Sequence, residues 1–314
     1  MTGDPTVLTP TQKAIRSSVA HRRPDVRGAV FQGALLLSLL VVMALLVTLL
    51  MEVARDGFDV FAERGGDFLT SNLSSRPERA GVWQGIKGSL LIAAFVVLLA
   101  FPLGIATAVY LEEYAPDNRL TRFVDLNIRN LAGVPSVVYG ILGLVVFVKW
   151  LGGSTGGRSV ISGGITMSIL VLPIVIITSA EAVRSVPRAL REGGYGIGAT
   201  PSDVVRRLVL PSAAPGILTG TVLSLSRALG ETAPLILVGA VGSGFYSTGD
   251  QGFFEQLQGG FSALPMIVYG WARQPRAEFR ALTSATIIVL LAITLLANAT
   301  AILLRNRYEQ RGEA

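Results

Sequence analysis

Apolar and polar positions separate into long blocks along this chain. Six stretches with few or no charged residues are each about 20 residues long, the length at which an apolar helix crosses a bilayer core of about 30 Å. None shows the period-two alternation that transmembrane β-strands require. The pattern therefore predicts an all-α integral membrane protein with six transmembrane helices. The stretches lie near residues 30–51, 88–111, 131–151, 162–180, 215–242 and 282–304.

The polar stretches between these blocks define a domain organisation. We expect a leader at 1–28, a first transmembrane helix at 29–53, an external loop at 54–85, a main transmembrane domain at 86–304 and a tail at 305–314. Within the main domain, the polar loop 181–213 is long enough to form a structure of its own. The 112–129 stretch mixes Leu120 and Phe123 with charges, a pattern that predicts a helix lying along the membrane surface.

Composition and charge agree with a membrane protein and indicate its orientation. Only 15% of the 314 residues are charged, against about 25% in soluble domains. Lys and Arg are twice as frequent in the leader, the 112–129 and 181–213 loops and the tail as in the alternate loops. Such a bias places both termini in the cytoplasm. The first apolar run is too long for a signal-peptide core, typically about 7–15 residues, so we expect it to be retained in a cell (inner) membrane.

Several kinds of chemistry find no support in the sequence. The chain has no cysteine, and its single histidine, His21, lies in the polar leader. No G-x-x-x-x-G-K-[ST] nucleotide motif occurs. We therefore expect no metal site, no catalytic residue and no cofactor bound by this chain. The net charge of +6 is spread over loops beside apolar runs, which favours lipid over nucleic acid as its surroundings.

The 181–213 loop predicts two short helices joined by a turn. Pro187 suits the start of the first helix, and Gly198 suits a turn because glycine adopts positive φ at little cost. Thr200 is a good N-cap residue for a second helix with Pro201 at its first position. We expect that second helix to end at Pro211.

The same loop resembles the coupling loop of ABC importer permeases, in which E-A-A is followed after three residues by Gly and, nine residues later, by I-x-L-P. The departures are the glycines at 193 and 194 and a leucine at 208. An ordinary basic inner loop and a DNA-reading helix–turn–helix are the alternatives. The resemblance implies a type I permease architecture and an element that docks into a cytoplasmic ATPase. The positions that it assigns to coupling are Glu192, Gly193, Gly194, Gly198, Ala199, Leu210 and Pro211.

Three further stretches look like the PstA-type permease subunits of phosphate importers: "LAGVPSVVYGILGL", "RALGETAPL" and "LPMIVYGWARQPRAEFRAL". This resemblance implies a phosphate permease that pairs with a PstC-type subunit. It also implies two copies of a PstB-type ATPase, which bind ATP and Mg²⁺, and a PstS-type phosphate-binding protein outside. On this reading the chain is not an enzyme, since its partners hydrolyse the ATP.

Two charges stand in the middle of the fifth apolar stretch. Arg227 and Glu231 are four residues apart, so on a helix they share a face near the bilayer centre. A charge there costs about 2.5–3.5 kcal/mol on insertion scales, so it needs a partner or water. One interpretation is an ion pair that neutralises itself; the other is that Arg227 contacts the phosphate and Glu231 rejects fully ionised anions. Ser226 and Thr232 would then supply neutral donors to the path.

Three alternative functions stay open at this point. The first is a permease for another oxyanion, such as sulfate or molybdate. The second is a membrane-embedded enzyme that uses Glu231 as an acid–base group, although no second carboxylate or histidine stands at that depth. The third is a passive anion channel that works without an ATPase.

Overall fold

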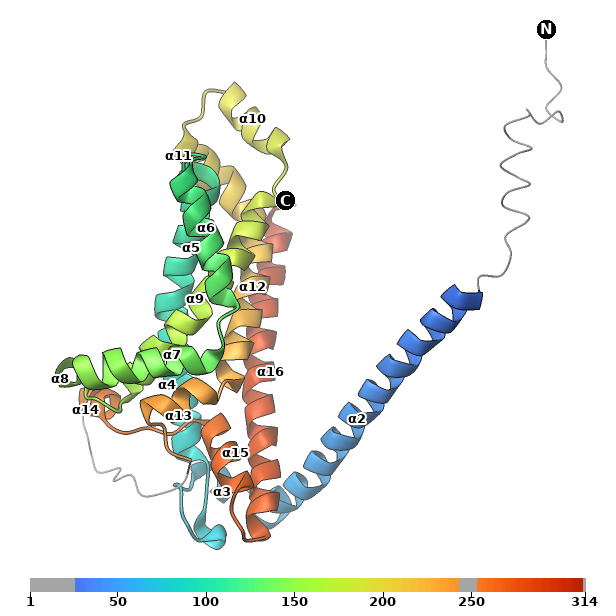
Figure 1. Cartoon of the computed structure of the whole chain (residues 1–314), viewed down its shortest axis with the longest axis vertical. Helices are drawn as coiled ribbons and strands as arrows, with labels where there is room; N and C mark the ends of the chain where they lie inside the picture. The colour runs from blue at the N-terminus through green and yellow to red at the C-terminus, as the bar shows by residue number, and fades with distance from the viewer. Residues whose placement is uncertain (1–25, 243–252, 313–314) are drawn as a thin grey trace, which may run out of the picture. The chain divides into compact units, whose positions relative to one another are not determined.

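The computed structural model describes residues 26–242 and 253–312, and every regular element in these ranges is helical (Figure 1). His21 and the expected loop residues 243–252 lie outside the described residues. By its internal contacts the chain divides into two units, one up to Glu52 and the other from Val53 onward. Each unit is described by itself.

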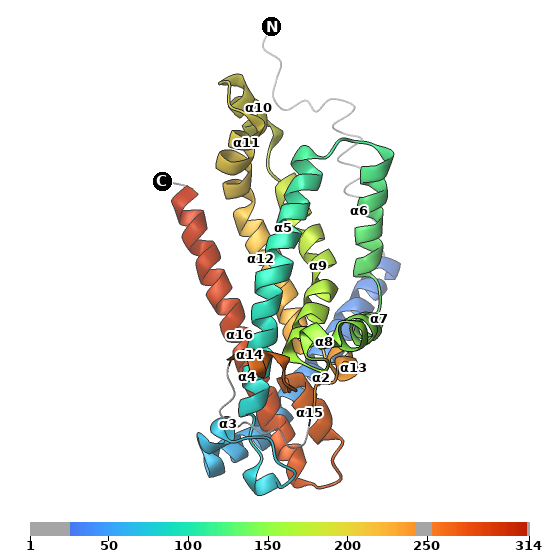
Figure 2. The same ribbon diagram turned by 90° about the vertical axis from the view of Figure 1, so that its left-hand side faces the viewer.

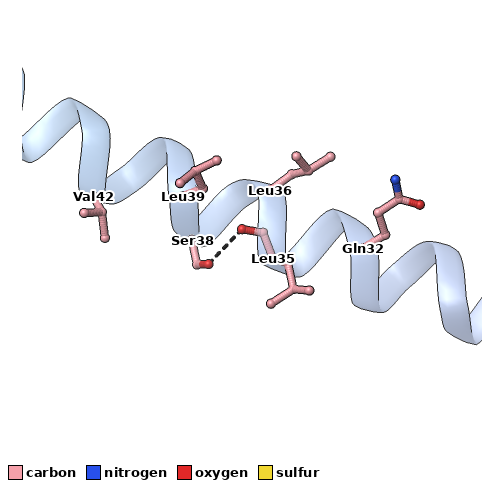
Figure 3. A pocket seen from close by; sticks show the side chains of 6 residues that line it. All are labelled: Gln32, Leu35, Leu36, Ser38, Leu39 and Val42. Carbon is pink, nitrogen blue, oxygen red and sulfur yellow. Dashed lines mark hydrogen bonds between the residues drawn. The ribbon is translucent and has the colours of Figure 1, made fainter. Parts of the chain in front are cut away.

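The first apolar run forms the long helix α2 (Val26–Arg64), which belongs to the first unit up to Glu52. Helix α2 was expected to end near residue 53, but it continues to Arg64 and ends before Gly65, whose φ is +54°. In the first unit, a shallow hollow on α2 is lined by apolar side chains with Gln32 and Ser38 (Figure 3). The Ser38 hydroxyl donates to the Leu35 carbonyl at 2.8 Å, so this polar group is satisfied within its own helix.

Five helical runs among the described residues are long and apolar enough to cross a membrane, and a bent pair of helices supplies a sixth. This agrees with the six predicted spans. The second run joins α4 (Trp83–Phe95) and α5 (Phe101–Val109) through short π-helical turns. The five runs are Val30–Arg64, Trp83–Tyr114, Val160–Arg184, Pro201–Gly230 and Glu278–Leu303.

The third predicted span is not one straight helix. Helix α6 (Arg119–Ala132) and the helix that begins with α7 (Ser136–Gly143) and ends at Trp150 meet at an angle of 99°. Pro135 causes the break, because proline disfavours helical geometry in the residue before it. The expected surface helix is α6, but it stands beside α5 and α9 (Val160–Arg184) instead of lying across them (Figure 2). The prediction of its helicity is confirmed and that of its direction is wrong.

The fifth span differs from its prediction at both ends. The helix that begins at Pro201 as α11 (Pro201–Val204) passes Pro211 without ending and continues as α12 (Leu210–Gly230). A π-helical turn at Val205–Val209 precedes Pro211 and accommodates the missing backbone donor. At the other end the chain leaves helical geometry at Glu231 and starts the short helix α13 (Ala233–Val238).

The remaining helices lie at the two ends of the second unit. At one end α10 (Arg188–Gly196) and α11 project beyond the long helices; at the other, α3 (Asp67–Thr70) and α15 (Leu264–Ala272) pack around the start of α16 (Glu278–Gly312) (Figures 1 and 2). We call these the α10 end and the α3 end. Three shorter elements complete the set: η1 (Pro77–Arg79), α8 (Gly152–Thr155) and α14 (Phe253–Gln258).

Separate apolar clusters stabilise the middle and both ends of this unit. The central cluster includes Val96, Met167 and Leu235, from the second span, α9 and α13. The cluster at the α3 end is rich in aromatic rings, with Phe68, Trp271 and Phe279 all fully buried. The cluster at the α10 end joins Val183 of α9 to Val204 and Val209, so the two-helix element rests on the ends of the spans.

Candidate functional site

Arg227 and Glu231 form an ion pair where α12 ends. The Arg227 Nε lies 3.3 Å from a carboxylate oxygen of Glu231. Glu231 is already outside the helix, with φ −77° and ψ 126°, so the pair bridges a helix end and the following break. The expectation of one continuous helical face is wrong, but the side chains still meet.

Helix packing gives the depth of this pair. Helices α12 and α9 are antiparallel, because Gly216 faces Ala182 and Gly220 faces Thr178. Arg227 is seven residues beyond Gly220, so it is level with the residue seven before Thr178, which is Val171. Val171 lies at the middle of the apolar run Val160–Arg184.

A contact between α12 and α16 gives a second indication of the depth of the ion pair. The Ser226 hydroxyl lies 2.5 Å from the Asn298 side-chain oxygen of α16, and Asn298 lies inside the apolar run Glu278–Leu303. Both neighbours therefore place the ion pair within the apolar length of the spans.

The two members of the pair differ in exposure. Half of the Arg227 side chain, 51%, is exposed, whereas only 20% of the Glu231 side chain is. A guanidinium that is half exposed at this depth faces a surface that the other helices of the second unit leave uncovered. Lipid is a poor environment for it, so water or another protein must meet it there.

A broken-helix arrangement surrounds the pair. Helices α7 and α13 run in the same direction, because Gly140 faces Pro234 and Gly143 faces Val238. Both begin on the side where α12 ends (Figure 1). Backbone that leaves helical geometry at membrane depth is tolerated where protein or a wet cavity satisfies it.

The two neutral residues of the predicted path have different surroundings. The Ser226 hydroxyl lies within hydrogen-bonding distance of both the Val222 carbonyl and Asn298, so it connects α12 to α16. Thr232 precedes α13 and is half-buried, and its hydroxyl does not cap that helix. Thr232 is therefore better placed than Ser226 to donate to something outside the chain.

The predicted two-helix element is present at the α10 end. Gly198 has φ +83° and makes the turn, and Thr200 accepts a hydrogen bond from the Asp203 backbone N–H, as its expected role of N-cap requires. Glu192 and Gly193 are exposed, Ala199 is half-buried and Gly194 is buried. Leu210 packs against the apolar cluster below, and Pro211 stands inside the continuing helix.

Two apolar side chains at this turn were not singled out from the sequence. Ile197 is 86% exposed and Tyr195 is 47% exposed. Apolar residues on both sides of Gly196, in a loop rich in glycine and charge, were the available signal. A large aliphatic side chain that is almost fully exposed at the tip of a projecting element indicates an interaction site.

A third missed feature lies beneath the element. The Arg191 guanidinium contacts Glu113, at the end of the second span, with Nη2 2.7 Å from the carboxylate. The Arg191 and Glu113 side chains are only 18% and 6% exposed. The two residues are 78 apart in sequence, and nothing local to either predicted their pairing.

The described residues hold no cluster of three or more His, Asp or Glu side chains that suits a metal ion. What the geometry offers instead is a half-exposed cation deep in a helical bundle and a projecting two-helix element at one end. Together they define a multi-pass membrane protein of the transport-permease class.

Residues 100–311 match the family described as binding-protein-dependent transport system inner membrane component, and the chain belongs to this family. It is 37% identical over 265 residues to the phosphate transport system permease protein PstA of Mycobacterium leprae, covering 81% of this chain and 82% of that protein. It is 31% identical over 251 residues to the PstC permease protein of Mesorhizobium japonicum, covering 72% and 76%.

The fold is also that of a solved structure. The permease of a bacterial alginate ABC transporter, crystallised with its alginate-bound periplasmic protein, superposes with a TM-score of 0.63 at 19% identity, covering 89% of this chain and 96% of that one. The chain is thus a multi-pass inner-membrane permease of the ABC importer fold.

Proposed function

We propose that this chain is the PstA-type permease subunit of an ATP-driven importer of inorganic phosphate. One observation carries the proposal: Arg227 is half exposed within the apolar depth of the second unit, on a face that the other helices of that unit leave uncovered. A cation at that position would stabilise an anion that crosses the apolar depth of the membrane. The names of the PstA and PstC relatives supply the substrate class.

The uncovered face suits a sister subunit. A PstC-type chain packed there would enclose Arg227 between two permease subunits, and the enclosed space would be the path. We place the α10 end and both termini in the cytoplasm, as the distribution of Lys and Arg indicates. The loop after α2, residues 65–85, and the other α3-end segments then face a PstS-type binding protein.

The two-helix element would couple this chain to a PstB-type ATPase. Ile197 and Tyr195 at its tip offer an apolar contact, and Glu192 offers a charge beside them. Two ATPase copies, one beneath each permease subunit, would bind ATP and Mg²⁺ and carry out the hydrolysis. This chain then needs no cofactor and performs no chemistry itself.

The ion pair suggests how phosphate would be held. A guanidinium presents a rigid fork to two phosphate oxygens, and the single 3.3 Å contact to Glu231 leaves most of the Arg227 donors available. At neutral pH phosphate retains a proton, and its protonated oxygen would donate a hydrogen bond to the Glu231 carboxylate. Sulfate has no such proton and meets only repulsion. Thr232 would add a neutral donor.

Anion selectivity tests this proposal. The complex is purified with its partner subunits and reconstituted in liposomes, and ATP-dependent uptake of radiolabelled phosphate is measured against unlabelled sulfate or molybdate. We expect the wild-type complex to carry phosphate and to resist both competitors. Glu231→Gln removes the repulsion, so sulfate should inhibit the remaining uptake about tenfold more strongly, the effect of about 1.4 kcal/mol.

Arg129→Ala serves as the matched control, since Arg129 pairs with Asp125 on α6, outside the proposed path. Its uptake and selectivity should equal those of wild type. A wild-type complex that transports sulfate or molybdate but not phosphate contradicts the proposal. Uptake that continues without ATP indicates a passive channel and contradicts it as well.

A further inference from the structure

Among the described residues, the most buried ion pair is the one between Arg191 and Glu113. Arg191 belongs to α10, in the projecting element, whereas Glu113 belongs to the π-helical turn Tyr110–Tyr114 that ends the second span. Arg191 Nε and Nη2 lie 3.1 and 2.7 Å from one carboxylate oxygen of Glu113. Two donors of one guanidinium thus converge on a single carboxylate oxygen, and both hydrogen bonds are charge-assisted.

The remaining donors of Arg191 bind the end of a second membrane helix. Nη1 donates to the Val186 carbonyl at 2.7 Å, and Nη2 donates to the Val183 carbonyl at 2.9 Å. These carbonyls belong to the C-terminal end of α9 and the turn that follows it, where backbone acceptors lack helical partners. One side chain thus joins α10 to the ends of two spans.

Burial strengthens the attraction between Arg191 and Glu113. The Glu113 side chain is 6% exposed and that of Arg191 is 18% exposed, so water screens their attraction little. Nearby, Arg184 pairs with Glu112 from the same π-helical turn, but the Arg184 side chain is 58% exposed and its side-chain hydrogen bonds go to Glu112. Two neighbouring carboxylates therefore have different roles: Glu113 connects α10 to the spans, and Glu112 connects only the spans.

We infer that Arg191 is a positioning residue that transmits movement of the projecting element to the second span and to α9 in the transport cycle. The inference rests on the proposed coupling of α10 to an ATPase. The other contacts between the element and the spans are mainly apolar side chains that can slide, as in the cluster of Val183 with Val204 and Val209. Arg191 makes the directional contact. Lysine carries its three donors on one nitrogen, so it does not reproduce the spread of Nε, Nη1 and Nη2 with which Arg191 reaches Glu113 and the two carbonyls.

The experiment follows movement directly. The chain has no cysteine, so spin labels can be attached to cysteines that replace Tyr114, beside Glu113, and Ile302 on α16; both side chains are exposed. The distance between the labels is measured in the assembled complex, without nucleotide and with a non-hydrolysed ATP analogue. We expect a nucleotide-driven change in the wild-type background and loss of that change with Arg191→Lys or Glu113→Gln.

Coupling is measured in parallel as the stimulation of ATP hydrolysis by loaded binding protein. Both variants should retain the basal ATPase rate and lose stimulation about tenfold or more, because breaking a buried charge pair disrupts its geometry. Arg184→Gln is the matched control and should keep both the distance change and the stimulation. Phosphate uptake by the wild-type complex tests the proposed function separately, since neither the label distance nor the basal hydrolysis depends on which anion is carried.

Three results would overturn the inference. One is a wild-type distance change that persists in both Arg191→Lys and Glu113→Gln. Another is the same loss in Arg184→Gln, which would show that any ion pair on this turn has the effect. The third is failure of even the conservative Glu113→Gln chain to assemble with the ATPase, which would assign the pair to assembly and not to transmission.

Discussion

Adjacent glycines in α10 offer a matched pair of substitutions with opposite expected effects. Gly193 and Gly194 stand where related coupling loops carry alanines. A Cβ built on Gly193 has no neighbouring atom within 4 Å. Gly193→Ala should therefore yield the full advantage of alanine over glycine in a helix, about 0.5–1 kcal/mol.

At Gly194 the same methyl group meets the second helix of the element. A Cβ there would lie 2.8 Å from Leu208 Cδ1 and 2.9 Å from Val204 Cγ2, closer than ordinary van der Waals contact. Overpacking of this kind costs about 1–3 kcal/mol. Set against a helix gain of about 0.5–1 kcal/mol, Gly194→Ala should destabilise the element by up to about 2.5 kcal/mol. Leu208 can change rotamer to relieve its contact, whereas the β-branched Val204 is stiff, so the element should loosen without unfolding the bundle.

Hydrogen exchange of the α10 amides in detergent measures both effects directly. We expect exchange in 188–196 to slow by up to about fivefold in Gly193→Ala, the factor for about 1 kcal/mol. Gly194→Ala should accelerate it by a similar or larger factor, and α9 and α16 should exchange as in wild type. Equal shifts in the same direction for the two variants would refute the packing argument, because the substitutions differ only in what their methyl groups contact.

Three other substitutions test separate parts of the account. Gly198→Ala forces a Cβ onto a residue with φ +83° and should cost about 1–2 kcal/mol, seen as faster exchange throughout the two-helix element; unchanged exchange would contradict the strained turn. Ile197→Ser should leave the melting temperature of the isolated chain unchanged and weaken its binding to the ATPase subunit about tenfold, measured by titration; unchanged affinity would exclude Ile197 from that interface. Asn298→Leu removes the α16 contact of Ser226 and should lower stability by about 0.6 kcal/mol; a loss of several kcal/mol in denaturant unfolding would show that the contact does more than join two helices.

The sequence was most informative where a single local property decides the structure. Long apolar runs predicted five of the spans because apolar length alone determines whether a helix crosses a bilayer. The turn at Gly198 and the cap at Thr200 followed from the conformational preferences of those residues, and both predictions are confirmed.

Breaks in the helices were harder to predict. Pro135 and Pro234 both accompany a change of direction, whereas Pro211 and Pro215 stand inside a continuous helix. The residue type is the same in all four cases. The difference lies in the tertiary contacts, such as the close approach of Gly140 to Pro234. The sequence alone does not reveal these contacts.

Contacts between segments distant in sequence could not be predicted for the same reason. Arg191 and Glu113 each looked like ordinary loop charges, and only the fold brings them together. The pairing of Arg227 with Glu231 was predicted from their spacing, but the uncovered face on which Arg227 lies required the structure.

The central claim is that Arg227 contacts the transported anion. Arg227→Ala and Arg227→Lys complexes, matched to wild type in subunit stoichiometry and basal ATP hydrolysis, are reconstituted and assayed for ATP-dependent phosphate uptake. The account predicts that uptake falls about a hundredfold in the alanine variant, as expected for the loss of a charged contact worth about 2–5 kcal/mol once the sister subunit encloses Arg227. The lysine variant should fall in between, since it keeps the charge and lacks the fork. Wild-type uptake in Arg227→Ala would contradict the account.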